Sequence, residues 1–482
     1  MTVKDTGSNV PSEETRNEGT ENIILKQYYL GCLSHASYLV GDPITRTSAV
    51  GDPQRDIDQY LKDAQDLGLN IDHVFLTHFH ADFLAGHLGL KEHTGARIYL
   101  GSQAEAEYDF TPLKTGERIE FGNVRLEILE TPGHSPESIS ILVYDLVQNK
   151  DEPYAILTGD TLFIGDVGRP DLRASLGWTA DELGGMLYDS IQDKILGLPD
   201  STLVYPAHGA GSMCGKHLSE ETVSTIGIQK KYNYALQPMS KQKFIDIVTA
   251  DQPDAPDYFT YDAVLNTKEH ATLLEIIRRV SNPLTLNEVI KLQGGGAQLL
   301  DVRNPVDYEG AHLKGSINIG LEGSFATWAG TILDSNKPIV IIAHPGLEQE
   351  AIIRLGRIGF DYIEGYLDGG MESALTRPDV MTRTERITPQ SLTELLTSEN
   401  PPSLLDVRNP GECKLSSIPG NVNIPLNHLK ERFDEVSASD DIVVYCAGGY
   451  RSSIAISLLE NHNYTHIFDL VGGISAWEAA QH

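Results

Sequence analysis

Residues 77–83 read Thr-His-Phe-His-Ala-Asp-Phe and decide how the first half of the chain is interpreted. The stretch follows an apolar run at 74–76, which predicts a short buried strand. Three side chains that can bind a metal, His78, His80 and Asp82, therefore stand just past a strand end, where a loop can fold them around one point. Two histidines near an aspartate also occur by chance, so the rest of the chain has to decide between the two interpretations.

Three later predicted strands end in the same way. The first breaks into Thr-Pro-Gly-His at His134, the second into Thr-Gly-Asp at Asp160, and the third into Pro-Ala-His at His208. Each motif alone is weak evidence. Four strand ends in succession that each deliver a histidine or an aspartate indicate one metal site assembled from loops on a rigid scaffold.

Composition narrows the class of protein. The 482 residues are 40% hydrophobic and 22% charged, which is ordinary for a globular protein, and the net charge is −31. This charge argues against nucleic acid and anionic membrane surfaces as partners. The four cysteines form no Cys-x-x-Cys pair, which favours a reducing cytoplasm over a disulfide framework.

The chain divides into four predicted segments. Residues 1–22 are polar, lack the apolar core of a signal peptide and are predicted to form a disordered tail. No run of about 18 apolar residues is present, so no membrane span is expected. The predicted domains cover residues 23–275, 284–380 and 385–482.

The last two domains are an internal repeat. Residues 301–305 (DVRNP) recur unchanged at 406–410, and residues 315–319 (GSINI) recur as GNVNI at 420–424. Each copy alternates short apolar strands with helical runs, which predicts a parallel α/β sheet.

A reactive loop is predicted in the second copy. Cys446 follows a buried strand and opens the stretch 446–452 (CAGGYRS), after which a helix begins. Successive backbone N–H groups in such a loop form an anion nest. The helix dipole and Arg451 are expected to lower the pKa of the thiol and make Cys446 a nucleophile. In the first copy Ala343 and Glu348 occupy the corresponding positions, so that copy is predicted to be catalytically inactive.

The four motifs of the first half together resemble the metallo-β-lactamase superfamily, over roughly residues 23–270. The resemblance implies an αββα sandwich with the metal at one edge. Binuclear hydrolases of this superfamily, such as glyoxalase II, have a histidine after the motif aspartate, whereas this chain has Phe83. Phenylalanine cannot bind a metal, which favours a mononuclear centre.

The mononuclear iron members of the superfamily are persulfide dioxygenases. Carried over, the resemblance assigns one Fe(II) per chain to His78, His134 and Asp160, a facial triad typical of non-heme Fe(II) oxygenases. Supporting roles around these ligands are assigned to His80, Asp82 and His208.

Two further residues are predicted to contact the substrate. A Gly-Arg-x-Asp segment resembles the substrate side of the family, which would place Arg169 near the iron to steady the anionic persulfide or sulfite. Tyr205, in Tyr-Pro-Ala-His, resembles a residue that hydrogen-bonds the substrate. Cys214 is interpreted as structural, although it follows His208 by only six residues.

The Cys446 loop resembles the active-site loop of rhodanese sulfurtransferases, in which the cysteine carries a persulfide. The whole chain thus resembles the persulfide dioxygenase–sulfurtransferase fusions that detoxify sulfide in bacteria. The implied fold is α/β and multidomain: an αββα metallo-β-lactamase sandwich followed by two rhodanese-like parallel α/β domains. The implied partners are a small thiol persulfide (of glutathione, coenzyme A or a similar thiol), O2, sulfite and thiosulfate, in a dimeric or tetrameric homo-oligomer.

Two alternatives stay open at this point. The first is a zinc-dependent thioester hydrolase of the glyoxalase II type fused to a rhodanese sulfur carrier. The second treats the repeat as a sulfur carrier or a partner-docking module without turnover of its own.

Overall fold

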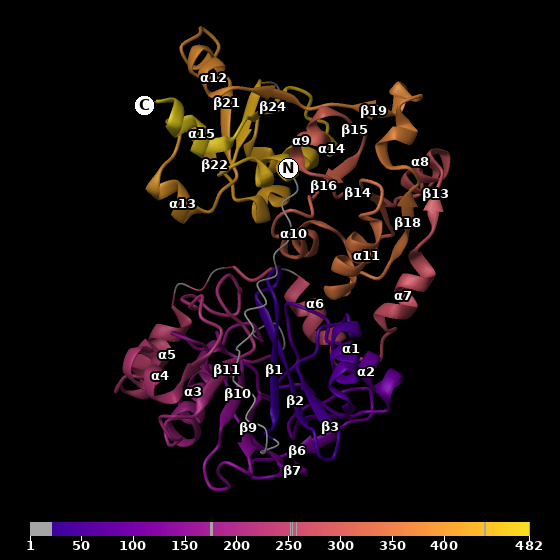
Figure 1. Cartoon of the computed structure of the whole chain (residues 1–482). Coiled ribbons are helices and arrows are strands. Elements are labelled where there is room, and N and C mark those ends of the chain that lie inside the picture. Colours follow the sequence, from indigo (N-terminus) through magenta and orange to yellow (C-terminus); the bar gives the residue numbers. More distant parts are fainter. Residues whose placement is uncertain are drawn as a thin grey trace.

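A computed structural model describes residues 22–173, 177–250, 252, 254–256, 258–437 and 440–481. Figure 1 shows the N-terminal domain at the bottom and the two copies of the repeat above it, with the helix α7 (Leu273–Val280) leading from one to the other. The predicted tail at 1–22 lies outside the described residues except for Asn22.

The N-terminal domain contains two six-stranded sheets. The order in the first sheet is β1-β2-β3-β4-β5-β6, and in the second it is β12-β11-β10-β9-β8-β7. The strands are β1 Ile24–Leu30, β2 His35–Asp42, β3 Thr47–Gly51, β4 Asn70–Phe75, β5 Arg97–Gly101, β6 Thr111–Leu113, β7 Arg118–Phe121, β8 Val124–Glu130, β9 Ile139–Asp145, β10 Ala155–Gly159, β11 Leu203–Pro206 and β12 Ser224–Thr225. The helices are α1 Asp58–Leu67, α2 His87–Thr94, α3 Ala180–Ser190, α4 Ile226–Tyr232, α5 Lys241–Thr249 and α6 Tyr258–Leu265.

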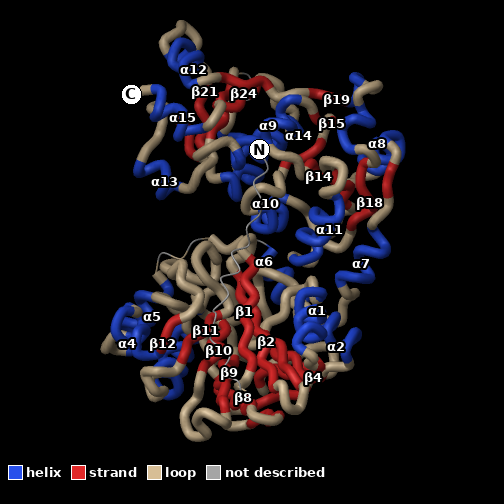
Figure 2. Tube along the Cα trace, in the orientation of Figure 1, coloured by secondary structure: helices blue, strands red, loops and turns tan. Residues whose placement is uncertain are grey.

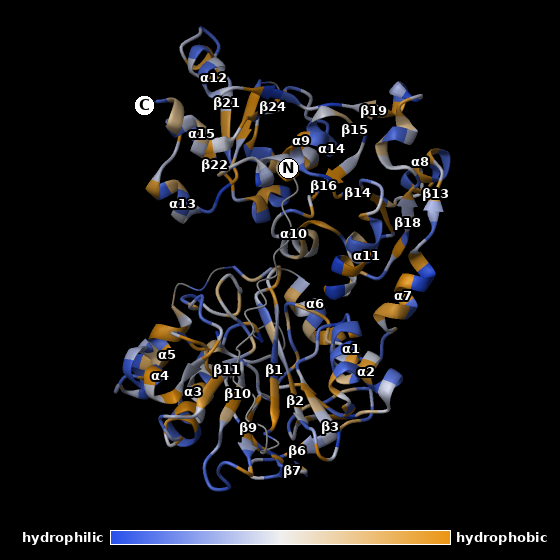
Figure 3. Ribbon diagram, viewed as in Figure 1, coloured by the Kyte–Doolittle hydropathy of each residue, from blue (hydrophilic) through white to orange (hydrophobic). Residues whose placement is uncertain are grey.

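Helices cover the outer faces of both sheets (Figure 2). Tyr60 and Ala64 of α1 pack on the first sheet, while Leu187 of α3 and Phe244 of α5 pack on the second. A third apolar cluster fills the space between the sheets. The strand ribbons are accordingly hydrophobic while the outer helices mix both kinds of residue (Figure 3). This is the αββα sandwich that the sequence predicted.

Each copy of the repeat contains a five-stranded parallel sheet. The order is β13-β18-β17-β14-β16 in the first copy and β20-β24-β23-β21-β22 in the second. The first copy comprises β13 Pro283–Leu284, α8 Leu286–Gly294, β14 Gln298–Asp301, α9 Pro305–Gly310, β15 His312–Leu313, β16 Ser316–Asn318, α10 Phe325–Ile332, β17 Ile339–Ile342, α11 Glu348–Arg357, β18 Ile363–Leu367 and β19 Met381–Thr382. The second comprises β20 Glu385–Ile387, α12 Pro389–Leu396, β21 Ser403–Asp406, α13 Pro410–Leu415, β22 Asn421–Asn423, β23 Ile442–Tyr445, α14 Tyr450–Asn461, β24 Ile467–Leu470 and α15 Gly473–Ala480.

The repeated Asp-Val-Arg segment has the same structure in both copies. Arg303 pairs with Asp301, and Arg408 pairs with Asp406, each at 2.6 Å and buried at the end of its strand. The two copies therefore place their following loops in equivalent positions, which confirms the repeat as a structural one.

The first copy packs directly on the N-terminal domain. The buried Arg55 donates to both carboxylate oxygens of Asp361, at 2.5 and 2.7 Å, and Arg357 pairs with Asp56 at 2.8 Å. The carbonyl of Arg357 also accepts the N–H of Leu84. Leu84 directly follows residues 77–83, which we call the metal-motif loop. The cysteine-less copy thus helps to hold that loop in place.

Within the described ranges, every helix is either too short or too polar to cross a membrane.

Candidate functional site

The four predicted strand ends converge at one edge of the sandwich. His78 follows β4, His134 follows β8, Asp160 directly follows β10 and His208 follows β11. All four side chains are buried, with at most 3% of each residue exposed. Because each comes from a loop after a buried strand, the scaffold rather than the local sequence fixes their relative positions.

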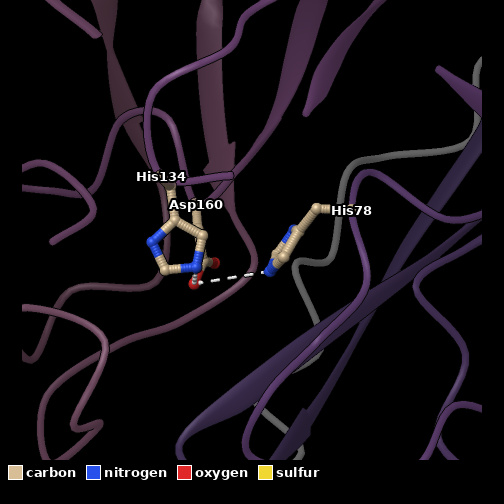
Figure 4. Close-up of side chains that lie close together, drawn as sticks. All are labelled: His78, His134 and Asp160. Atoms are coloured by element: carbon tan, nitrogen blue, oxygen red, sulfur yellow. Dashed lines mark ion pairs between the residues drawn. The ribbon is translucent and has the colours of Figure 1, made fainter. Parts of the chain in front are cut away.

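His78, His134 and Asp160 form the central group (Figure 4). Their ligand atoms lie within 4.8 Å of one another. Oδ2 of Asp160 is 3.8 Å from Nε2 of His78 and 3.5 Å from Nε2 of His134. Among the described residues neither His78 Nε2 nor Asp160 Oδ2 has a hydrogen-bond partner, although both atoms are buried. Unpaired buried atoms of this kind are costly unless they bind a cation.

Hydrogen bonds fix the tautomer of both histidines. Nδ1 of His134 donates to the carbonyl of Arg169 at 3.0 Å, because a carbonyl can only accept. The hydroxyl of Thr77 donates to Asp52 and so accepts from Nδ1 of His78, also at 3.0 Å. Each ring therefore presents the lone pair of Nε2 to the centre, as metal-binding histidines do.

The protonation states also suit a metal. Burial lowers the pKa of His78 well below its usual value and lowers that of His134, so both rings are neutral. Burial alone would raise the pKa of Asp160, but the nearby ring of His208, which also donates a hydrogen bond to it, outweighs burial and holds the pKa well below its usual value. Two neutral imidazoles and one carboxylate are the donor set of a divalent-ion site.

His208 joins this group to a second one, formed by His80, Asp82 and His208, whose ligand atoms also lie within 4.8 Å of one another. Its Nδ1 donates to Asp160 Oδ1 at 2.8 Å, and its Nε2 donates to Asp82 Oδ2 at 2.9 Å. Burial would lower the pKa of His208, but the two carboxylates raise it well above the usual value. A ring that donates from both nitrogens has no lone pair for a metal. The supporting role of His208 and Asp82 stays a prediction.

His80 lies beside Asp52. Its Nε2 lies 3.0 Å from Oδ1 of Asp52, and its ring is tilted against that of His78 with the centroids 4.1 Å apart. Phe83 is 1% exposed and packs its ring against that of His80. The position directly after the motif aspartate Asp82 is thus occupied by a buried apolar ring.

The sequence interpretation missed His35. It stands at the start of β2, is fully buried, and packs on Phe83 with the ring centroids 4.1 Å apart. Its ring is also 5.5 Å from those of His80 and His208. No motif marks this residue, because it enters the site from a strand whose sequence reads like any other buried strand.

Arg169 is buried beside the site. Its guanidinium is bound by Asp171 at 2.6 and 2.8 Å and donates to the carbonyl of Met213, and its own carbonyl accepts from a proposed ligand, His134. The preceding Gly168 is required by close packing, since a Cβ there would lie 1.9 Å from the carbonyl oxygen of Asp160. The direct contact between Arg169 and substrate stays a prediction.

Tyr205 lies in the apolar cluster between the sheets, with its ring centroid 5.5 Å from that of Tyr38. Its hydrogen bond to substrate also stays a prediction. Cys214 is buried beside Asp160 and His208, and burial raises the pKa of its thiol well above the usual value, which suits a structural cysteine.

Asn266 holds the metal-motif loop from outside. This fully buried side chain, just after α6, donates to the carbonyls of His80 and Phe83 at 2.8 Å and accepts the N–H of Ala85 at 2.9 Å. It lies more than 180 residues from the loop in sequence, so no local pattern could indicate it.

Replacing Asn266 with alanine should loosen the loop and weaken metal binding. Three buried backbone groups would lose their hydrogen-bond partner. At roughly 1–3 kcal/mol per group, we expect the free energy of unfolding to fall by about 3 kcal/mol or more. Calorimetry should show a lower unfolding temperature, and elemental analysis should show less metal per chain. The exposed Asn336→Ala is the control, and equal values for both variants would contradict this role.

The Cys446 loop follows β23 in the second copy. Sγ of Cys446 accepts the N–H of Gly449 at 3.1 Å, and Gly449 adopts a positive φ of 113° that favours glycine. Arg451, in the first turn of α14, pairs with both oxygens of Glu412 at 2.7 Å and interacts electrostatically with the cysteine. One inward N–H of the loop thus contacts the sulfur, and the anion nest of several N–H groups stays a prediction.

The first copy lacks this chemistry at the same place. Ala343 follows β17 as Cys446 follows β23, and the registers of the two sheets match at Asp301 and Asp406. Glu348 turns its carboxylate to the N–H of Gly346. No nucleophile stands at this position.

Comparison with known proteins defines the class. The model of the metallo-beta-lactamase superfamily matches residues 42–208, and the model of the rhodanese-like domain matches residues 285–375 and 388–480. A crystal structure titled metallo-beta-lactamase from Staphylococcus aureus subsp. aureus COL is 32% identical, covers 71% of this chain and 98% of its own, and has a TM-score of 0.64. The chain belongs to the metallo-beta-lactamase superfamily, in an architecture that continues into two rhodanese-like domains.

Curated relatives resemble the N-terminal domain. The mitochondrial persulfide dioxygenase ETHE1 of Homo sapiens, like that of Bos taurus, is 29% identical over 230 residues, which cover 47% of this chain and 80% of the relative. The hydroxyacylglutathione hydrolase GloC of Haemophilus influenzae is 26% identical over 217 residues, which cover 40% of this chain and 90% of the relative.

Proposed function

We propose that the chain is a bifunctional sulfur enzyme. Its N-terminal domain oxidises a small thiol persulfide to sulfite with O2, and its last domain transfers a persulfide sulfur through Cys446 to sulfite, which yields thiosulfate. The observation that carries the proposal is the combination in one chain of a two-histidine, one-carboxylate group and a cysteine in an anion-binding loop. The similarity to persulfide dioxygenases supports the first activity, and the rhodanese-like match supports the second.

One Fe(II) per chain fits the group formed by His78, His134 and Asp160. Bound there, iron would supply the electrons that O2 chemistry needs and that zinc cannot provide. Two observations support this fit. Nε2 of His78 and Oδ2 of Asp160 are buried without a hydrogen-bond partner among the described residues. The tautomers of His78 and His134 leave a lone pair on Nε2 of each ring for the metal.

The surrounding residues hold this arrangement during turnover. The carbonyl of Arg169 keeps His134 in its metal-binding tautomer, and His208 keeps Asp160 turned so that Oδ2 faces the centre. Burial of the whole group excludes bulk water. In this proposal the hydrolytic alternative is disfavoured by the ring of Phe83, which fills the place of a further ligand.

In the last domain Cys446 is the nucleophile. Its thiolate attacks the outer sulfur of R–S–SH and releases R–SH, and the resulting cysteine persulfide gives that sulfur to sulfite and returns to the thiolate. Backbone N–H groups of the loop stabilise the negative charge on sulfur in both steps. Arg451 adds a positive charge from the first turn of α14.

Metal analysis separates the proposed function from the thioester hydrolase. Purified protein loaded under anaerobic conditions should bind about one iron per chain and consume O2 only when a small-molecule persulfide is added. Elemental analysis and an oxygen electrode give both values. Two zinc ions per chain with thioester hydrolysis and no oxygen uptake would favour the hydrolase instead.

A further inference from the structure

A cavity of about 320 Å³ is lined by Asp82 of the metal-motif loop, although none of His78, His134 and Asp160 lines it. Asp82, Ser34 and Cys32 line it on the side of the N-terminal domain, together with Tyr258 of α6. Because Asp82 is bound to His208, which in turn is bound to Asp160, one wall of this cavity belongs to the hydrogen-bonded network of the site.

A larger cavity of about 760 Å³ lies beside the second copy of the repeat. Asn409, Pro410 and Asn423 line it there, at the ends of β21 and β22, and β21 pairs with β23, the strand that precedes the reactive loop. Asn409 caps the helix α13, from which Glu412 pairs with Arg451. This cavity therefore borders the start of α13, the helix whose Glu412 holds Arg451, while none of residues 446–452 lines it.

The two cavities share one junction. Met213 of the N-terminal domain and Ser324 and Thr327 at the start of α10 line both of them. The reactive loop reaches the junction as well, since Tyr450 donates to the carbonyl of Gly320 at 2.8 Å and a Cβ on Gly323 would lie 2.7 Å from the ring of Tyr450. The cysteine-less copy thus supplies one wall of a space that borders Asp82 on one side and the start of α13 on the other.

The linings of the two cavities carry charges of both signs, from Asp82, Asp254 and Glu431 and from Arg432. The three junction side chains are uncharged, so they neither trap nor repel sulfite. The chain as a whole carries a net charge of −31, which disfavours the approach of sulfite from bulk solution. Sulfite formed inside the cleft is therefore better placed to reach Cys446 than sulfite from outside.

We propose that this cleft conveys sulfite from the metal group to Cys446 and that α10 of the first copy forms its junction. The inference rests on the proposed function. In the first step R–S–SH, O2 and H2O give R–SH, SO3²⁻ and two protons. In the second, SO3²⁻ takes the outer sulfur of the Cys446 persulfide and leaves as S2O3²⁻ with the thiolate restored.

Isotope labelling tests the proposal on the full chain loaded with iron. A persulfide labelled in its outer sulfur is turned over with O2 while unlabelled sulfite is present at about ten times the final amount of product. Conveyed sulfite gives thiosulfate that carries the label in both sulfur positions, and mass spectrometry measures that fraction. Full mixing with the added sulfite would leave less than about a tenth of the thiosulfate doubly labelled, since labelled sulfite reaches one part in ten only at the end, and this result would overturn the proposal.

Filling the junction should divert sulfite into solution. Thr327→Trp is expected to lower the doubly labelled fraction by at least about threefold, and Ser324→Trp, at an exposed position, provides a second variant if the first folds poorly. Glu322→Trp is the control, because Glu322 is exposed and lines neither cavity. If wild-type enzyme gives doubly labelled thiosulfate and neither junction variant lowers that fraction, the assignment of this cleft is overturned.

The same samples separate this proposal from the proposed function. Oxygen uptake with persulfide, and thiosulfate formation from persulfide and added sulfite, are each measured alone. If wild-type protein lacks either activity, the proposed function fails. If both activities are present and the labels mix fully, only the conveyance of sulfite fails.

Discussion

Replacing Cys446 with serine is expected to reduce thiosulfate formation by at least about a thousandfold, because removal of a nucleophile costs enzymes a factor of this order or more. A serine hydroxyl is not ionised at neutral pH and cannot accept sulfane sulfur as a thiolate does. The loop should keep its shape, since the N–H of Gly449 can donate to a hydroxyl oxygen in place of Sγ.

Oxygen uptake should survive the same substitution. The metal group contains no atom of the second copy, so Cys446→Ser should still oxidise persulfide and should accumulate sulfite in place of thiosulfate. Ion chromatography of the products and an oxygen electrode measure both quantities. Unchanged thiosulfate in this variant would show that Cys446 is not the sulfur carrier.

Cys413 provides a matched control in the same domain. Cys413 is on the helix α13, and its thiol lies 3.2 Å from the carboxylate of Asp406. Burial, and to a smaller extent this carboxylate, raise the pKa of the thiol to about 11. A thiol that stays protonated is a poor nucleophile, so Cys413→Ser should leave thiosulfate formation near the wild-type rate.

Replacing His134 with alanine should have the opposite pattern. It removes one of three proposed ligands, and persulfide-dependent oxygen uptake should fall by more than about a hundredfold, since even the loss of a residue that only supports a ligand costs 10–100-fold. Iron per chain should fall in parallel. Transfer of sulfur from persulfide to added sulfite should persist, because Cys446 is untouched.

The exposed His93 on α2 is the control for this variant. His93→Ala should keep both its iron and its oxygen uptake. If His134→Ala retained iron and full oxygen uptake, the metal group would have to be assigned to other residues.

The arrangement of domains could be predicted from the sequence for a physical reason. Buried strands and the turns after them leave a periodic trace, and the two copies of Asp-Val-Arg mark the same strand end twice. The structure confirms the αββα sandwich, the two parallel sheets and their order in the chain. The exact domain limits at 275, 284, 380 and 385 stay predictions.

The site could be predicted only in part. His78, His134 and Asp160 stand in motifs at strand ends, and the structure brings them together. His35 and Asn266 reach the same place from β2 and from the end of α6, and their positions depend on packing between elements distant in the chain. A single sequence carries no local signal for such contacts.

The cysteine-less copy also has a role that its sequence does not reveal. Its lost nucleophile predicts only that it is catalytically inactive. In the structure Arg357 of this copy contacts the metal-motif loop through Leu84, and α10 lines the junction of the two cavities. Residues that build an interface between domains carry no recognisable motif in the sequence, because what they contribute is their place in the folded structure.

The stoichiometry of one reaction tests the central claim most directly. Iron-loaded protein is mixed with a small-molecule persulfide and a limiting amount of O2, and the oxygen consumed and the thiosulfate formed are measured together. The two proposed steps add up to one thiosulfate for each O2, with two persulfides consumed, and this ratio is the expected result. An absence of oxygen uptake, or sulfite as the sole oxidised product of the unmodified chain, would contradict the account.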